Sequence, residues 1–154
     1  MSAAPQKAKA GAEKIEVVVN AIVPLNELVT RFEFKRRDGE VFPPFSAGAH
    51  TVVEMKDDGR IRLNPYSLMS DPADQSTYAI SVRRDDEGRG GSLFMHNNVS
   101  VGDEMTITYP VNLFPIDLRG GKHVFLAGGI GITPLMAMIA QLDRMGGAWG
   151  LHYS

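Results

Sequence analysis

The sequence predicts a run of antiparallel β-strands, arranged as a barrel or a sandwich, followed by the start of an α/β unit. Two observations carry this prediction. From Ile15 to Tyr109, short runs of alternating apolar and polar residues are separated by turn dipeptides. After Pro115, a compact apolar run, a glycine-rich turn and a helical pattern follow in that order.

The expected strands can be followed along the chain. Apolar runs at Val17 to Val19 and Ile22 to Val23 open the region, and Val29 to Lys35 alternates. Later strands are expected at Tyr78 to Arg83 and at Met105 to Tyr109, because apolar side chains recur at every second position. The turn dipeptides are Asp38-Gly39, Asp58-Gly59, Asp71-Pro72 and Gly102-Asp103.

The second unit reads as strand, helix, strand. Val124 to Ala127 is uniformly apolar, as in a strand buried on both faces. Thr133 is expected to cap a helix that starts at Pro134 and ends before Gly146-Gly147. Trp149 to Tyr153 then resumes as a strand. One face of the helix carries Leu135, Met138, Ile139 and Leu142.

These patterns divide the chain into three parts. We expect a flexible tail at 1–14, a barrel domain at 15–118 and an incomplete nucleotide-binding domain at 119–154. A single β-α-β unit leaves sheet edges and a helix face uncovered, so the sequence is expected to be a fragment or truncation rather than a complete protein.

Composition restricts the function classes. The chain of 154 residues is 44% hydrophobic and 22% charged, as in a globular protein. A net charge of −2 and a pI near 6.1 argue against nucleic acid as the main partner. The sequence has no apolar run of membrane-spanning length and no secretory signal, so a cytoplasmic protein is expected. Without cysteine, thiolate chemistry and cysteine-ligated metal centres are excluded within these residues.

A glycine-rich turn, Gly128 to Pro134, lies between the expected buried strand and the helix. Glycines let a ligand approach the backbone, and a helix N-terminus offers unpaired N–H groups to an anion. Pro134 stands where the dinucleotide-binding fingerprint has its third glycine, so that fingerprint is incomplete. Taken alone, the turn is also compatible with any tight strand-to-helix connection.

A second glycine-rich segment, Gly88 to Ser92, precedes a short helix expected from Ser92 to about Asn98. Ser92 is expected to cap this helix, the glycines to wrap a phosphate and Arg89 to add a charged contact. The alternative is a long hairpin connection after the mixed-charge run Arg83 to Glu87.

A third segment, Arg62 to Leu68, contains Tyr66 and Ser67. A tyrosine offers a flat face to an aromatic ring and a hydroxyl to a polar chain, although a half-buried strand tyrosine is commoner.

The order of these segments resembles the ferredoxin–NADP reductase superfamily, and within it the phthalate dioxygenase reductase and vanillate demethylase reductase branch. The resemblance runs from about Ile15 to Ser154. It is carried by the three segments above together with Tyr78 to Arg84 and Asn112 to Pro115. It implies a six-stranded antiparallel Greek-key flavin barrel, followed by the first β-α-β of a nicotinamide domain with a parallel sheet.

The resemblance also implies the site residues. Tyr66 and Ser67 would contact the isoalloxazine ring and ribityl chain, and Thr133 would lie near the flavin edge. The glycines of the second unit would leave space for the nicotinamide. The cofactor-binding residues carried over are Arg62, Tyr66, Ser67, Arg83, Gly88, Arg89, Gly90, Gly91, Ser92, Gly128, Gly129, Gly131 and Thr133. The four histidines show no metal-ligand spacing and are expected to be structural or on the surface.

One residue departs from the family pattern Arg-x-Tyr-Ser. Asn64 stands two residues before Tyr66, and Arg62 stands four before it. Two alternatives follow: either the backbone bulges at Pro65 so that Arg62 reaches the flavin phosphate, or Asn64 replaces the charge with a weaker dipole. The bulge is slightly favoured.

The function implied is that of an oxygenase reductase component. NADH or NADPH would reduce a flavin, FMN ahead of FAD, which would pass electrons to an iron–sulfur domain or ferredoxin and a terminal oxygenase. The 2Fe–2S cluster would lie outside this chain, since it has no cysteine. Two alternatives remain: a flavin-binding electron-transfer module without its own NAD(P)H turnover, and a β-barrel interaction domain with chance motifs.

Overall fold

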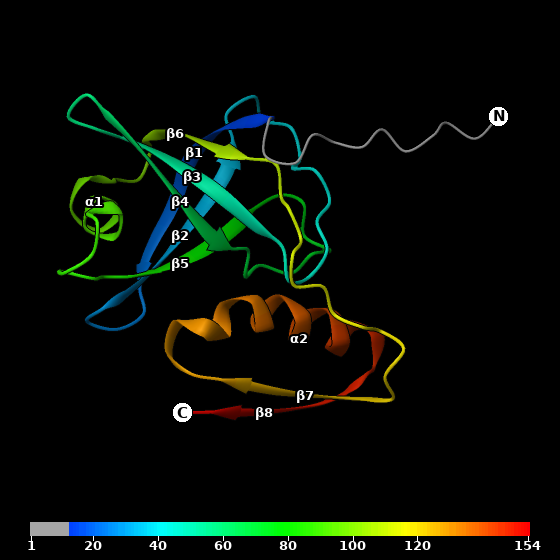
Figure 1. Ribbon diagram of the computed structural model, residues 1–154. Coiled ribbons are helices and arrows are strands. Elements are labelled where there is room, and N and C mark those ends of the chain that lie inside the picture. Colours follow the sequence, from blue (N-terminus) through cyan, green and yellow to red (C-terminus); the bar gives the residue numbers. More distant parts are fainter. Residues whose placement is uncertain (1–12) are drawn as a thin grey trace.

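A computed structural model describes residues 13–154 of the protein (Figure 1). Most of the expected tail, residues 1–12, lies outside the described residues. The first strand, β1 (Lys14–Pro24), begins at the last residue of that expected tail.

The first part of the chain is a six-stranded antiparallel sheet that curls into a half-barrel. Its strands stand in the spatial order β4-β3-β6-β1-β2-β5. The edge strands β4 and β5 contact each other, which brings the two ends of the sheet together (Figure 1). The antiparallel prediction is confirmed, and the fold is the curled sheet rather than the sandwich. The remaining bounds are β2 (Val29–Arg36), β3 (His50–Asp57), β4 (Arg60–Ser67), β5 (Tyr78–Arg83) and β6 (Glu104–Thr108).

The core fills the concave side of the curled sheet. Strand β2 buries every second residue, as the alternating pattern predicted, and β3 and the first half of β1 do the same. Strand β5 is buried on both faces except at Arg83. The ring of Tyr78 stacks on that of Phe42 with centroids 3.9 Å apart, and the Tyr78 hydroxyl donates to the carbonyl oxygen of Pro43.

The helix α1 (Gly91–Asn98) packs against β3, β4 and β5, near the opening between the two edge strands. Met95 anchors it and is fully buried. The residue before the helix is Gly90, with φ +97°, and no side chain caps the first turn. The expectation that Ser92 caps this helix is therefore wrong, because the glycine conformation starts the helix one residue earlier.

The second unit has the predicted β-α-β order. Strand β7 (Lys122–Ala127) pairs in parallel with β8 (Ala148–Tyr153), and α2 (Thr133–Met145) connects them. Helix α2 buries its predicted apolar face and ends at Gly146, which has φ +70°.

Two details of this unit differ from the prediction. The 3-10 turn η1 (Gly129–Ile132) leads directly into α2, so Thr133 is a helical residue and caps nothing. Strand β7 is buried on one face only, since Val124 and Leu126 are exposed while Phe125 is buried. Helix α2 covers that one face, and no described element covers the other (Figure 1).

The two units share one continuous core. Helix α2 lies under the open end of the half-barrel (Figure 1), and a Cβ atom on Gly48 would lie 2.9 Å from Cε of Met138. The connecting segment is fastened to the barrel by Asn112, whose amide donates to Ser46 Oγ at 2.6 Å and to the carbonyl oxygen of Ala47 at 3.0 Å. The relative position of the two units is therefore set by packing and by specific hydrogen bonds.

Candidate functional site

Three side chains of β4 share one face of the strand: Arg62, Asn64 and Tyr66. All three are partly buried, and the residues between them are exposed. Strand β4 pairs with β3 in one unbroken register along its whole length. The expected bulge at Pro65 is therefore wrong. The period of two along a strand is enough to put Arg62 on the same side as Tyr66.

The side chain of Asn64 lies between Tyr66 and the first turn of α1. Its amide nitrogen donates to the Tyr66 hydroxyl at 3.3 Å, and a Cβ atom on Gly91 would lie only 2.2 Å from that nitrogen. Burial raises the pKa of the Tyr66 phenol above its ordinary value, and the hydrogen bond from Asn64 opposes that rise. Asn64 is thus a neutral, packed contact where the family pattern has arginine.

The guanidinium of Arg62 reaches the glycine-rich loop before α1. Its Nη1 donates to the carbonyl oxygen of Arg89, and a Cβ atom on Gly90 would lie 3.1 Å from its Cζ. On the other side, its Nε donates to the Asp57 carboxylate at 2.7 Å. The side chain of Arg62 is therefore long enough to reach the glycine-rich loop. Asn64 contacts the adjacent first turn of α1.

The N-terminus of α1 has the features of an anion site. Its first turn contains no acidic residue and makes no side-chain cap hydrogen bond, so its backbone N–H dipoles remain available to an anion. The Ser92 hydroxyl is held by Asp85, whose backbone N–H donates to it at 3.0 Å. Gly88 is also beside Asp85, because a Cβ atom there would lie 2.9 Å from the Asp85 carboxylate. These contacts fold the loop back toward α1, with Arg62 beside it.

A second group of predicted residues meets in a cleft of about 360 Å³ between the two units. Arg83 lines it from the end of β5, and Gly129 and Thr133 line it from the second unit. Sequence reasoning missed other lining residues, among them Leu28, Met69, Ser81 and Tyr153. No local pattern distinguishes these from ordinary strand and loop residues, because they meet only when the two units pack together.

The glycine-rich turn leaves open space beside its backbone. Gly129 has φ +53°, and Cβ atoms on Gly129 or Gly131 would meet no atom within 4 Å. The Tyr153 hydroxyl donates to the carbonyl oxygen of Gly129 at 3.0 Å, and the Thr133 hydroxyl donates to that of Ile130 at 3.1 Å. A flat ligand could therefore approach this turn without displacing protein atoms. Gly128 lies apart from the cleft, at a shallow hollow formed by the ends of β7 and β8.

The first group lies along β4, and the second lies in the cleft between the two units. Strand β4 runs from the end near α1, where Arg62 lies, toward the end that faces α2, where Tyr66 and Ser67 lie (Figure 1). At about 3.3 Å per residue, the four residues from Arg62 to Tyr66 span roughly 13 Å. The arrangement suits an elongated ligand with an anionic end at α1 and an aromatic end toward the second unit.

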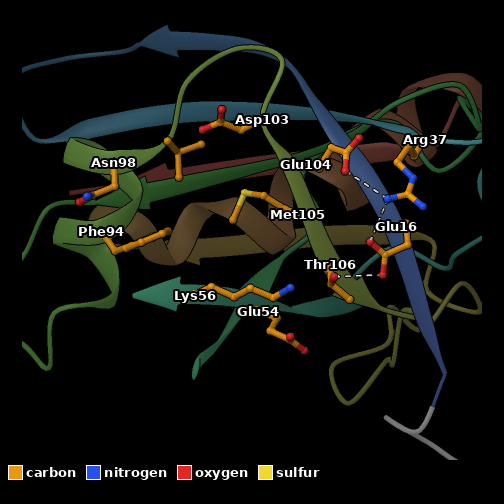
Figure 2. A pocket seen from close by; sticks show the side chains of 11 residues that line it. Glu16, Arg37, Glu54, Lys56, Phe94, Asn98, Asp103, Glu104, Met105 and Thr106 are labelled. Carbon is orange, nitrogen blue, oxygen red and sulfur yellow. Dashed lines mark hydrogen bonds and ion pairs between the residues drawn. The ribbon is translucent and has the colours of Figure 1, made fainter. Parts of the chain in front are cut away.

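Another hollow of about 360 Å³ lies on the outer side of the barrel between α1, β6 and β3 (Figure 2). Three of its charged side chains form one group: Arg37 binds Glu104 at 3.1 Å and lies 4.0 Å from Glu16, which accepts from Thr106. It contains none of the predicted site residues. The candidate site therefore comprises the side chains along β4 with the N-terminus of α1, and the cleft between the two units.

The histidines have structural contacts. His96 bonds through Nε2 to the carbonyl oxygen of Val82 at 2.9 Å, and His123 bonds likewise to that of Asp117 at 2.7 Å.

Over residues 13–154, no helix combines the length and the apolar character needed to cross a membrane.

Comparison with known proteins gives a consistent result. No family model matches the chain. The chain is 46% identical over 142 residues to the carnitine monooxygenase reductase subunit of Acinetobacter baumannii, covering 92% of this chain and 44% of that protein. It is 40% identical over 139 residues to the vanillate O-demethylase oxidoreductase of a Pseudomonas species, covering 90% of this chain and 43% of that protein.

Among solved structures, phthalate dioxygenase reductase superposes with a TM-score of 0.85 at 35% identity, over 91% of this chain and 43% of that one. The chain spans less than half the length of each of these relatives. The curled sheet, the β-α-β unit and the sequence matches lead to the same assignment. The chain is related, over about nine-tenths of its own length, to ferredoxin reductase-like proteins such as the vanillate demethylase and phthalate dioxygenase reductases.

Proposed function

We propose that this chain is the flavin-binding part of an NAD(P)H-dependent reductase that supplies electrons to an oxygenase. The observation that carries the proposal is the arrangement along β4, with Tyr66 at one end and Arg62 beside the uncapped N-terminus of α1 at the other. The names of the relatives support it, since two are reductase or oxidoreductase components of monooxygenase and demethylase systems.

The residues of β4 and α1 fit a flavin mononucleotide. Tyr66 would hold the ring by its face and hydroxyl, and Ser67 would contact the ribityl chain. The phosphate would lie at the loop Gly88 to Ser92, where the backbone N–H groups of α1 and the guanidinium of Arg62 both favour an anion. The N-terminus of α1, with Arg62 beside it and Arg89 in the preceding loop, offers one anion site, which matches a single phosphate, so we propose FMN ahead of FAD.

The cleft between the two units would receive the nicotinamide. Its walls are mainly apolar, as in most cofactor sites, and Arg83 adds one charge. Gly129 and Gly131 leave room for a flat ring, and Thr133 would lie near the flavin edge, where the two units meet. We accordingly propose that residues 15–118 form the flavin domain and residues 119–154 the start of the nicotinamide domain.

When bound, the flavin would accept two electrons from NAD(P)H and release them one at a time, and the protein would supply orientation and electrostatics. The acceptor we propose is a 2Fe–2S centre outside this chain, in a ferredoxin or another domain, with a terminal oxygenase beyond it. Phthalate dioxygenase reductase is described as transferring electrons from pyridine nucleotides to such a centre.

Reduction of the flavin-loaded chain by NADH and NADPH under anaerobic conditions tests this proposal. Loss of the visible flavin absorbance on the timescale of enzymatic turnover would support the proposal that the chain acts as a reductase. Stable flavin binding with no reduction would favour the second candidate, an electron-transfer module without its own turnover.

A further inference from the structure

The ion pair between Asp57 and Arg62 connects the β3–β4 hairpin to the glycine-rich loop. Arg62 Nε donates to Asp57 Oδ2 at 2.7 Å, and Arg62 Nη1 donates to the carbonyl oxygen of Arg89. The two side chains are only 27% and 31% exposed, Arg62 being the first. The guanidinium is therefore bound on two sides, by the hairpin and by the loop.

The hairpin fixes the position of the carboxylate. Asp57 pairs with Arg60, and Met55 pairs with Arg62, so Asp57 is a diagonal neighbour of Arg62 on the same face of the sheet. The turn between them has positive φ at both central residues, +45° at Asp58 and +79° at Gly59. Such a turn fits the twist of two strands and sets their register. The carboxylate is thus presented to Arg62 by backbone geometry.

The neighbouring polar side chain cannot take over the role of Arg62. Asn64 is uncharged, its amide nitrogen is bonded to the Tyr66 hydroxyl, and it packs against Gly91. Arg62 is therefore the residue through which β4 brings a positive charge beside α1. A free arginine side chain has many rotamers, so fixing one of them carries a cost in conformational entropy.

We propose that Asp57 is a positioning residue that holds Arg62 across the glycine-rich loop, ready to bind the phosphate of the flavin. This inference rests on the proposed flavin function. Of the five N–H donors of a guanidinium, Asp57 and the Arg89 carbonyl occupy two, and the others remain for a phosphate. In the family pattern, the arginine stands two residues before the tyrosine. Here Arg62, held by Asp57, supplies the phosphate-binding charge from the position four residues before Tyr66.

The direction in which Asp57→Asn changes the affinity for FMN distinguishes a positioning role from a purely electrostatic one. Asp57 carries a negative charge near the phosphate site, so if it acted only through charge, Asp57→Asn would strengthen FMN binding. If it positions Arg62, Asp57→Asn weakens FMN binding. Asp58→Asn is the matched control: it removes the same charge one residue away, Asp58 is exposed, and asparagine tolerates its positive φ.

The experiment measures the dissociation constants of FMN and of riboflavin, which lacks the phosphate, for the full chain by flavin fluorescence. We expect Arg62→Ala to weaken FMN binding by about tenfold or more, and Asp57→Asn by about three- to tenfold. Riboflavin binding should stay within about twofold in both variants, which also shows that they fold. Asp58→Asn should change neither constant, and Asp57→Asn should have no further effect in an Arg62→Ala background.

Two results overturn the inference while leaving the proposed function intact. One is unchanged or tighter FMN binding by Asp57→Asn when riboflavin binding is normal. The other is an Arg62→Ala variant that binds FMN as well as the wild type does. If the wild-type chain binds neither FMN nor riboflavin, the proposed function and this inference both fail. An Asp57→Asn variant that also loses riboflavin binding contradicts a role limited to the phosphate.

Discussion

The amide nitrogen of Asn64 occupies the space in which a side chain on Gly91 would stand. A Cβ atom on Gly91 would lie 2.2 Å from that nitrogen, far inside van der Waals contact. The same nitrogen donates to the Tyr66 hydroxyl. The first turn of α1 and the ring of Tyr66 are therefore linked through one short side chain.

Gly91→Ala should destabilise the protein by about 1–3 kcal/mol, because the added methyl group overlaps a partly buried, hydrogen-bonded side chain. The measurement is the free energy of unfolding in urea. Gly121→Ala is the control, since its Cβ would meet no atom within 4 Å. Adding Asn64→Ala to Gly91→Ala should recover most of the loss. A double variant no more stable than Gly91→Ala would show that the overlap is not the cause.

Gly48→Ala tests the junction between the two units. Gly48 has φ +101°, and its Cβ would lie 1.9 Å from the carbonyl oxygen of Phe114. Gly39 also has a positive φ, +78°, but has open space around it. Gly39→Ala should therefore lower the free energy of unfolding only by the backbone strain, about 1–2 kcal/mol. Gly48→Ala should lower it by more than about 3 kcal/mol or prevent folding. Equal losses in thermal or urea unfolding would contradict the assigned close approach.

Tyr78 should make the protein less stable at alkaline pH. Burial raises the pKa of its phenol well above the ordinary value. Because the folded pKa lies above the unfolded one, the stabilisation is complete below about pH 10 and declines as the pH rises further, by up to about 1.4 kcal/mol per pH unit.

Urea unfolding at pH 8 and at pH 11 checks this for the wild type and for Tyr78→Phe. The variant loses the hydrogen bond to Pro43, so at pH 8 it should be less stable by about 1 kcal/mol. Between the two pH values it should lose less stability than the wild type. The same alkaline loss in both proteins would assign the effect to another group.

Thr133→Val addresses the nicotinamide side of the proposed site. Thr133 lines the cleft, and its hydroxyl bonds to the carbonyl oxygen of Ile130. Valine keeps the shape but removes that bond, so the glycine-rich turn should lose its fixed position. We expect flavin affinity to be unchanged and the anaerobic rate of flavin reduction by NADH to fall by about tenfold, which corresponds to about 1.4 kcal/mol. A stopped-flow rate equal to that of the wild type would argue against a role for this turn.

Local patterns predicted the strands that bury one face. Along such a strand apolar and polar residues alternate, and this alternation does not depend on which elements lie beside the strand. They also predicted α2 and its glycine end. They failed where the structure depends on tertiary context. Val124 and Leu126 have the composition of a buried strand, but burial on a second face requires another layer, which the local sequence does not specify.

The candidate site was predicted only in part, because some of its contacts also depend on tertiary context. The residues of β4 and of the glycine-rich loop could be named from their motifs, but the place of Arg62 depends on register. A bulge was expected because Pro65 precedes Tyr66, yet Pro65 is tolerated at this edge strand without one. Asp57 was missed because an aspartate before Asp58-Gly59 reads as turn chemistry. Its pairing with Arg62 becomes visible only once the hairpin register is known.

The central claim is that the face of β4 that carries Arg62 and Tyr66 binds a flavin with its phosphate at α1. The most direct measurement is a fluorescence titration of the purified chain with FMN, repeated with riboflavin. The account predicts saturable quenching with one FMN per chain, and weaker binding of riboflavin because it lacks the phosphate that Arg62 and the α1 N-terminus attract. A folded chain that quenches neither flavin would contradict the account.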